Sequence, residues 1–308
     1  MDSRRIRRRS PLLTGMAMSG LAVMMFLVPP TSATAAPTIS SAFEPVSTSL
    51  NGYWLAAADG SVYNFGSAAN FGSMAGKPLA QPVLDMAATP TNHGYWLVAS
   101  DGGVFTFGDA RFYGSMGGKP LRDSMISITT TLDGQGYWLA SHDGGVFAYG
   151  DAAFYGSLGG TPLNKPVTDI VATPDGGGYW LVAADGGVFA FGDAKFYGSL
   201  AGGRLYADIN GMATTPDGRG YWLVDAGGGV FSFGDAQFYG STGNAPPATP
   251  VFHMAATASG SGYRFVTTDG SVFDFGDATF YGSHPSPPPS RAGGLFTSAP
   301  PIVSIVGS

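Results

Sequence analysis

The 308-residue chain contains no cysteine, and this absence excludes disulfide bonds, thiolate zinc sites and cysteine nucleophiles. Charged side chains are also scarce, at 12% of the residues, and Glu44 is the only glutamate. The chain has instead 48 glycines and 22 prolines, which indicate many short strands joined by tight turns. We therefore expect an all-β protein that is stabilised by packing or by closure of its fold.

The first 35 residues have the pattern of a secretory signal peptide. Five arginines end at Arg9, an apolar run extends over 12–28, and Ala33-Thr34-Ala35 supplies the small residues that signal peptidase reads. We predict cleavage after Ala35 and a secreted protein, extracellular or associated with the cell wall. The alternative is an uncleaved membrane anchor, and both the general secretory and the twin-arginine routes stay open.

Cleavage changes the charge that a partner would meet. Residues 1–35 hold five arginines and one aspartate, so their removal changes the formal net charge from −6 to −10. This charge argues against nucleic acid and against anionic membrane surfaces as partners. We expect residues 36–50 to be a lead-in segment and the cleaved protein to be a monomer without stable membrane insertion.

Residues 51–308 contain six copies of a 42-residue repeat. One repeat divides into four predicted strands, at 83–89, 95–100, 104–107 and 111–115, which is the size of a propeller blade. The second of these strands is apolar on both faces, so we expect neighbouring units to cover both. The sequence predicts a six-bladed β-propeller of four-stranded blades, and an open β-solenoid is the alternative. Five repeats begin with Gly-Tyr-Trp and the sixth with Gly-Tyr-Arg, at Gly52, Gly94, Gly136, Gly178, Gly220 and Gly262.

The C-terminal segment offers a way to close the propeller. The first repeat has no good leading strand, because residues 40–47 match the repeat poorly. Residues 301–306, Pro-Ile-Val-Ser-Ile-Val, follow a Pro-rich loop and resemble the leading strand Pro-Val-Thr-Asp-Ile-Val at 166–171. We therefore predict that a strand at 301–307 completes the first blade and removes two open sheet edges.

The run from Asp185 to Ser199, Asp-Gly-Gly-Val-Phe-Ala-Phe-Gly-Asp-Ala-Lys-Phe-Tyr-Gly-Ser, resembles a tandem repeat of secreted actinobacterial proteins. There the repeat occurs alone or beside cell-wall hydrolase domains. The resemblance covers about residues 50–283 and implies an extracellular, propeller-like module with no established activity. The pattern Asp-Gly-x-Val-x-x-x-Gly is also distantly similar to the regulator of chromosome condensation family, which forms seven-bladed propellers. This chain lacks that family's usual Trp and has shorter repeats, so only the architecture carries over.

Two aspartates recur in the repeat, and we interpret them as turn residues. A catalytic group would be needed once, whereas an Asx turn explains every copy. Calcium loops need clustered oxygen ligands, and no loop of this sequence has that pattern. The first position holds Asp59, Asp101, Asp143, Asp185 and Asp269, and the second holds Asp109, Asp151, Asp193, Asp235 and Asp277.

A tyrosine near the end of five repeats is a candidate platform for stacking on sugars. The alternative is that these rings pack between blades, because aromatic side chains dominate such cores. Several weak sugar sites would gain avidity by repetition. The candidates are Tyr113, Tyr155, Tyr197, Tyr239 and Tyr281.

One position in the leading strand is polar or glycine in all six repeats. In a propeller this strand lines the central channel, so the position predicts either a hydrated channel or a small-ligand site. Asp85, Asp169 and His253 would be its most reactive members and would suit a divalent ion, although we assign no metal, cofactor or catalytic residue from sequence. The residues are Asp85, Ser127, Asp169, Gly211, His253 and Ser304.

The leading hypothesis is a secreted, non-enzymatic binding module for a glycan, a cell-wall component or a protein partner. Blade repetition, abundant aromatic residues and the absence of an obvious catalytic motif support it. The first alternative is a propeller hydrolase or lyase that acts at the central channel. The second is a structural or adhesive surface protein. Fold alone does not choose among them.

Overall fold

The structure is a computed structural model that describes residues 51–284, 290–292, 295–297 and 299–307. The predicted signal peptide and lead-in segment lie outside the described residues. The described part is all-β and contains six three-stranded antiparallel sheets and one two-stranded sheet. Within these residues no helix is long and apolar enough to cross a membrane.

Each repeat contributes two or three consecutive strands to one sheet. The leading strands are β3 (Val83–Ala88), β6 (Met125–Thr130), β9 (Val167–Ala172), β12 (Ile209–Thr214) and β15 (Val251–Ala256). The middle strands are β1 (Gly52–Ala57), β4 (Gly94–Ala99), β7 (Gly136–Ser141), β10 (Gly178–Ala183), β13 (Gly220–Asp225) and β16 (Gly262–Thr267). The outer strands are β2 (Val62–Gly66), β5 (Val104–Gly108), β8 (Val146–Gly150), β11 (Val188–Gly192), β14 (Val230–Gly234) and β17 (Val272–Gly276). The short strands β18 (Ser290–Ala292) and β19 (Leu295–Thr297) pair with each other, and β20 (Ile302–Gly307) follows.

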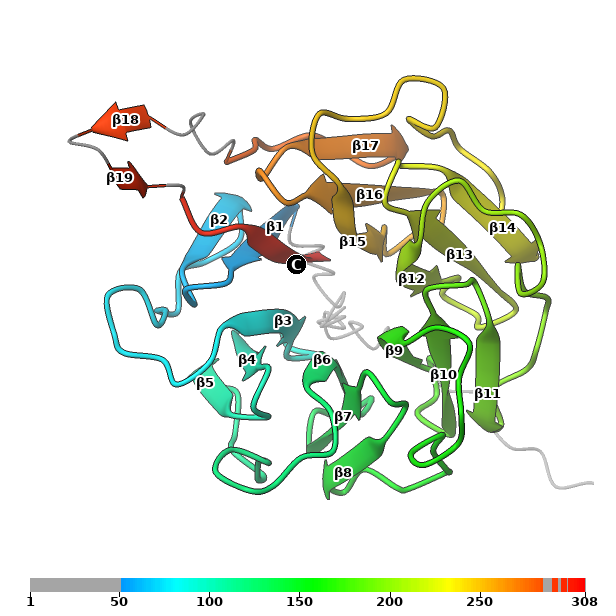
Figure 1. Ribbon diagram of the computed structural model, residues 1–308, viewed down its shortest axis with the longest axis horizontal. Helices are drawn as coiled ribbons and strands as arrows, with labels where there is room; N and C mark the ends of the chain where they lie inside the picture. The colour runs from blue at the N-terminus through cyan, green and yellow to red at the C-terminus, as the bar shows by residue number, and fades with distance from the viewer. Residues whose placement is uncertain (1–50, 285–289, 293–294, 298, 308) are drawn as a thin grey trace, which may run out of the picture. The chain divides into compact units, whose positions relative to one another are not determined.

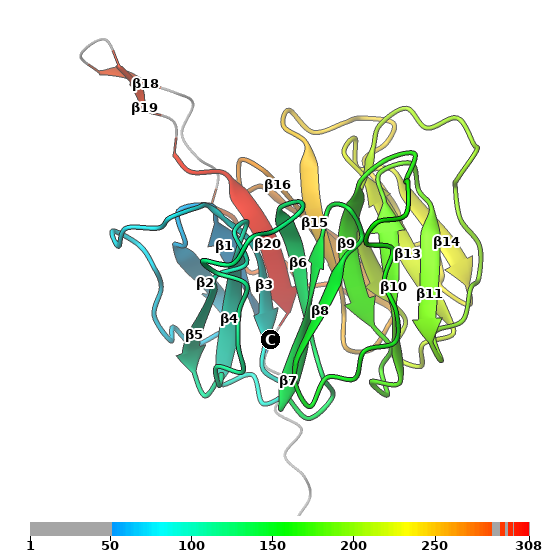
Figure 2. The same cartoon turned by 60° about the horizontal axis from the view of Figure 1, so that its bottom comes forward.

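The sheets are arranged like the blades of a propeller (Figure 1). Each leading strand contacts the leading strand of the next repeat, from β3 through β6, β9 and β12 to β15. Strand β20 contacts both β15 and β3, so the contacts between inner strands form a cycle. Figure 2 shows successive sheets side by side.

The prediction of a C-terminal strand that completes the first repeat is confirmed. Strand β20 pairs antiparallel with β1, with Leu55 opposite Ile305, in a sheet of order β2-β1-β20. It occupies the place that a leading strand fills in every other repeat, such as β9 beside β10. The first sheet is therefore assembled from the two ends of the repeat region.

The prediction of four strands per blade is wrong, because each of the six sheets that the repeats form has three. The segment predicted as a fourth strand, 111–115 in the second repeat, has no strand partner. Side chains take its backbone groups instead. Trp96 Nε1 donates to the carbonyl of Arg111 at 2.7 Å, and the Tyr137 hydroxyl of the next repeat donates to the carbonyl of Gly114 at 2.6 Å. A backbone whose polar groups are already bonded gains little by joining a sheet.

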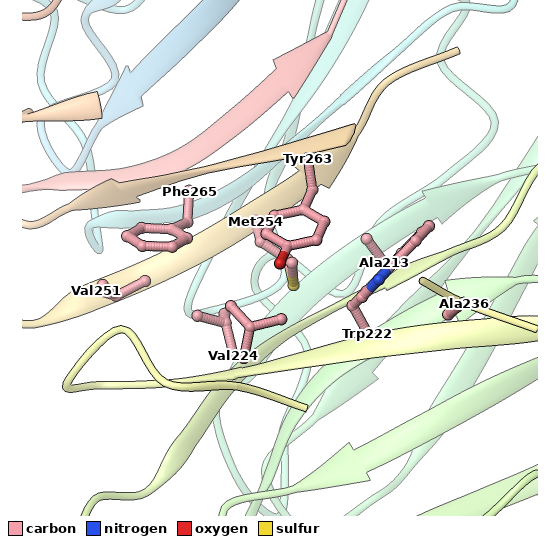
Figure 3. Close-up of a cluster of buried hydrophobic side chains, with 9 residues drawn as sticks. Ala213, Trp222, Val224, Ala236, Val251, Met254, Tyr263 and Phe265 are labelled. Atoms are coloured by element: carbon pink, nitrogen blue, oxygen red, sulfur yellow. The ribbon is translucent and has the colours of Figure 1, made fainter. Parts of the chain in front are cut away.

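The core consists of interfaces between neighbouring sheets. All residues of the middle strand β4 are buried, as the two apolar faces predict. The Trp of each of the first five repeats packs against the first Tyr of the following repeat, with ring centroids 5.5–5.9 Å apart. Figure 3 shows such an interface, in which Trp222 of β13 and Tyr263 of β16 lie with Val224, Met254 and Phe265. Such burial of large aromatic rings gives each interface most of its stabilisation.

The tyrosine hydroxyl at this interface gives a testable contribution to stability. Tyr137 Oη accepts hydrogen bonds from the amides of Tyr113 and Gly114, besides the bond that it donates. We expect Tyr137→Phe to lower the free energy of unfolding by about 1–3 kcal/mol, because half-buried backbone groups lose their partner. Urea denaturation measures this, with Tyr206→Phe as the control at a side chain that is 96% exposed. Equal losses in both variants would contradict the bridging role.

The recurring turn aspartates have the predicted role. Asp101 Oδ1 accepts a hydrogen bond from the amide of Gly103 at 2.9 Å, and corresponding bonds occur at the other four positions. The fifth repeat has Gly227 at this place, and there Asp225, two residues earlier, accepts from the amides of Gly227 and Gly229. The aspartate at the second recurring position accepts from a threonine 20 residues earlier, as Asp109 does from Thr89.

Candidate ligand site in the central channel

The predicted channel position is the third residue of every inner strand. A β-bulge directly precedes it in all six strands; in β3, for example, the pairing shifts between Val83 and Asp85. A bulge inserts one residue and re-aims the side chain that follows. The six residues, which we call the polar ring, are Asp85, Ser127, Asp169, Gly211, His253 and Ser304.

The structure brings five side chains of the polar ring together. Ser127 Oγ lies 2.8 Å from Asp85 Oδ2 and 2.8 Å from Asp169 Oδ1, so it bridges the two carboxyl groups. Ser304 Oγ donates to Asp85 Oδ1 at 2.7 Å. His253 Nε2 lies 3.8 Å from Asp85 Oδ1 and 3.9 Å from Asp169 Oδ2.

Gly211 provides no side chain to this cluster. A Cβ atom at this position would lie 3.2 Å from the Met254 amide nitrogen and 3.5 Å from the His253 Cα. The backbone beside His253 is therefore too close for a larger residue without local movement.

Backbone amides hold both carboxyl groups in place. Asp85 accepts from the amides of Met86 at 2.7 Å and Ile128 at 3.0 Å. Asp169 accepts from the amides of Ile170 at 2.8 Å and Met212 at 3.0 Å. In each case one amide is local and the other belongs to another repeat, so these carboxyl groups also join the inner strands. Such multiple donors offset part of the cost of burying a charged group.

The two carboxyl groups are almost inaccessible to solvent, while His253 is partly exposed. The pKa of Asp169 is raised from 3.8 to about 6, chiefly by burial; His253 opposes this shift and the neighbouring Asp85 carboxylate adds to it. The serine bridge agrees with this direction, because Ser127 has one hydroxyl hydrogen for two carboxyl groups. A proton on Asp169 would satisfy the second contact.

The polar ring lies between two cavities of the channel. One cavity, of about 380 Å³, is lined by residues that follow the ring in all six inner strands, such as Thr129 and Val171. The other, of about 280 Å³, is lined by residues that precede it, such as Leu84 and Phe252. Asp85, Ser127, Asp169 and His253 line both cavities. A small ligand could therefore meet these groups from either side.

The five candidate stacking tyrosines are half-buried and bonded to the next repeat. In four of them the hydroxyl donates to a backbone carbonyl 21 residues later, as Tyr197 does to Gly218 at 3.0 Å. Their rings contact neighbouring aromatic side chains, for example Tyr197 against Tyr221. This geometry gives them a packing role, and it leaves part of each ring accessible.

Two of these tyrosines line crevices at corresponding places between repeats. Tyr197 lines a cavity of about 300 Å³ between the fourth and fifth repeats, together with Asp175, Asp193, Lys195 and Arg219. We call it the 4/5 crevice. Tyr281 lines a cavity of about 560 Å³ between the sixth and first repeats, which also includes Asn51, Arg264 and Asp277. We call this the 6/1 crevice.

Sequence reasoning missed the phenylalanine that precedes each of these tyrosines. These rings are 58–61% exposed in all five repeats. Because a Phe-Tyr pair in an extended segment places its rings on opposite sides, only one of them can pack inward. The sequence did contain a signal for the ring that packs inward: a tyrosine can satisfy its hydroxyl with a backbone partner at an interface between repeats. The exposed residues are Phe112, Phe154, Phe196, Phe238 and Phe280.

Comparisons with known proteins assign this chain to no family. No protein-family model matches the chain, and no curated protein matches its sequence. The resemblance to secreted actinobacterial repeats therefore stays a prediction, and the case for function depends on the geometry of the crevices and of the polar ring.

Proposed function

We propose that this protein is an exported, closed six-bladed β-propeller that binds glycans of the cell wall through crevices between adjacent repeats. The signal-peptide pattern at 1–35 supports export. The cycle of contacts between inner strands, completed by β20, supports closure. The resemblance of the repeat to those of secreted actinobacterial proteins agrees with a cell-wall partner.

The observation that carries the proposal is the shared composition of the two crevices. Tyr197 and Asp193 line the 4/5 crevice, and the residues at the same two positions of the repeat, Tyr281 and Asp277, line the 6/1 crevice. A sugar ring has an apolar C–H face and a rim of hydroxyls. A half-buried aromatic ring beside carboxylate and cationic groups fits both parts. Two or more weak sites on one rigid scaffold would gain affinity on a polymeric ligand.

We expect purified protein to bind isolated cell wall and to select a subset of glycans on an array. Tyr197→Ala combined with Tyr281→Ala should weaken this binding by at least about tenfold, since both stacking faces are lost. Arg219→Ala, at an exposed side chain of the 4/5 crevice, should weaken it with less risk to folding.

Phe196→Ala is the matched control, because Phe196 is adjacent to Tyr197 but does not line the crevice. Binding that is lost in Phe196→Ala and retained in the crevice variants would move the site to the exposed phenylalanines and overturn the crevice assignment. Folded wild-type protein that binds neither cell wall nor any glycan would overturn the proposal as a whole. Capture of a protein partner in its place would favour the adhesive alternative.

A hydrolase or lyase at the central channel is a second candidate function. The convergence of Asp85, Asp169 and His253 favours it, because buried carboxyl groups with perturbed pKa values mark many active sites. Its test is release of soluble fragments from cell-wall polysaccharide by the wild type. Equal release by Asp169→Asn would exclude this centre.

A further inference from the structure

The polar ring contains three groups of the kind that ligate divalent metal ions. Asp85, Asp169 and His253 each offer one ligand atom, and the three atoms lie within 4.8 Å of one another. An ion equidistant from three atoms that are each 4.8 Å apart would lie about 2.8 Å from each, so a small inward movement of the side chains would bring them to the coordination distances of about 2.0–2.2 Å that Zn²⁺ takes. The two carboxylates and the imidazole come from three different inner strands, so the closed arrangement of strands creates the cluster.

The orientation of His253 is an independent observation that points to a cation. Its Nδ1 lies 3.2 Å from the carbonyl oxygen of Ile305. A carbonyl only accepts hydrogen bonds, so Nδ1 carries a proton, and in the neutral form of this ring the lone pair is on Nε2. Nε2 lies 3.8 Å from Asp85 Oδ1 and 3.9 Å from Asp169 Oδ2, beyond hydrogen-bond distance. An Nδ1–H bonded to a backbone carbonyl is the usual support of a histidine that binds metal through Nε2.

Charge and access fit the same interpretation. No lysine or arginine is among the described residues that line the two cavities, so the two buried carboxylates have no fixed cationic partner there. A divalent ion would balance both charges. Ser127 and Ser304 donate hydrogen bonds to the carboxylate oxygens, as the supporting residues of metal ligands commonly do. The cavities on both sides leave room for water to complete the coordination.

We propose that the polar ring binds one divalent metal ion through Asp85, Asp169 and Nε2 of His253. A mixed oxygen and imidazole set suits Mn²⁺ or Zn²⁺ better than Ca²⁺, which prefers six or more oxygens. The ion would link strands β3, β9 and β15 across the centre of the fold. This site is separate from the crevices, so metal binding can be tested independently of glycan binding.

The experiment is calorimetric titration of the full, chelator-stripped protein with Zn²⁺ and with Mn²⁺, together with thermal melts. We expect one ion per chain and an increase of Tm with metal concentration, because binding to the folded state stabilises it. His253→Gln and Asp169→Asn, which preserve side-chain size, should each weaken binding at least about tenfold. His93→Ala, at an exposed turn histidine, should leave it unchanged.

Each outcome decides the proposal. Folded wild-type protein that binds neither ion overturns it. Binding that is unchanged in both ring variants, or is lost in His93→Ala, shows an adventitious surface site and also overturns it. Circular dichroism of each variant excludes misfolding as the cause of lost binding, and the isosteric Asp169→Asn removes a buried charge rather than creating one.

Discussion

A chain that ends before residue 299 is expected to lose most of its stability and to aggregate. Strand β20 buries Ile302, Val303 and Ile305 almost completely against β1 and its neighbours. Burial of each such side chain contributes about 1.5–3 kcal/mol, so the three together contribute roughly 5–9 kcal/mol. A typical domain is stable by about 5–15 kcal/mol, so this loss is comparable with the whole.

The truncation would also damage the sheet and the polar ring. Strand β1 would lose its inner partner and become an open edge, which favours pairing between molecules. Asp85 would lose the hydroxyl of Ser304, and His253 the carbonyl of Ile305. The effect should therefore extend beyond the first repeat to the repeats that supply these two side chains.

Thermal melting and size-exclusion chromatography of the truncated chain measure the effect. A peptide of residues 299–308, added in excess, should restore a cooperative transition by supplying the missing strand. Among full-length variants, Ile305→Ala should cost about 2–5 kcal/mol. Gly307→Ala is the control, since a Cβ atom there meets nothing within 4 Å. A truncated chain that melts at the wild-type temperature would show that β20 does not stabilise the fold.

The sequence was sufficient to predict this closing strand and the polar ring, because both follow from a fixed period. Once the repeat is aligned, Ser304 falls at the position of Asp85 without any structural knowledge. The bulge before each ring residue was not predictable, because the residue that it inserts, such as Leu84 or Phe252, looks like an ordinary strand residue. Because a bulge re-aims the side chain that follows it, the approach of the Asp85 and Asp169 carboxylates to Nε2 of His253 could not be predicted either.

The fourth segment of each repeat shows the limit of reasoning from local pattern. Residues 111–115 include an adjacent Phe and Tyr, and aromatic residues are common in strands. The side chains that take their backbone groups, Trp96 and Tyr137, are 15 and 23 residues away from their acceptors. Local propensity carries no information about such partners, so the segment could be assigned correctly only from the three-dimensional structure.

The sixth repeat departs from the Trp pattern at the interface with the first repeat. Arg264 occupies the Trp position, and its guanidinium carbon lies 4.7 Å from the centre of the Tyr53 ring. Its Nη2 lies 3.4 Å from the carbonyl of Thr279, the acceptor that corresponds to those bonded by the five tryptophans. The arginine thus replaces both the ring stacking and the hydrogen bond of a tryptophan, at the interface between the sixth repeat and the first.

Arg264 is buried, and its charge is balanced by the carboxylate of Asp274. Its Nε donates to Asp274 Oδ1 at 2.9 Å across the β16–β17 pair, and both side chains are only 9% exposed. Among the described residues the second oxygen of Asp274 has no hydrogen-bond partner. A buried ion pair with an unsatisfied oxygen gives little net stability, but removal of one partner leaves the other charge buried alone.

We therefore expect Arg264→Ala and Arg264→Trp each to destabilise the protein by about 3–5 kcal/mol, because Asp274 is left without its cation. The double variant Arg264→Trp with Asp274→Ala recreates the third and fourth repeats, which have Ala148 and Ala190 opposite Trp138 and Trp180. It should be as stable as the wild type or more stable, by up to about 4 kcal/mol. A double-mutant cycle from denaturation midpoints measures this coupling. If Arg264→Trp alone were as stable as the double variant, the buried Asp274 charge would not be the source of the cost, and the sixth repeat would tolerate either residue at the interface that closes the cycle of sheets.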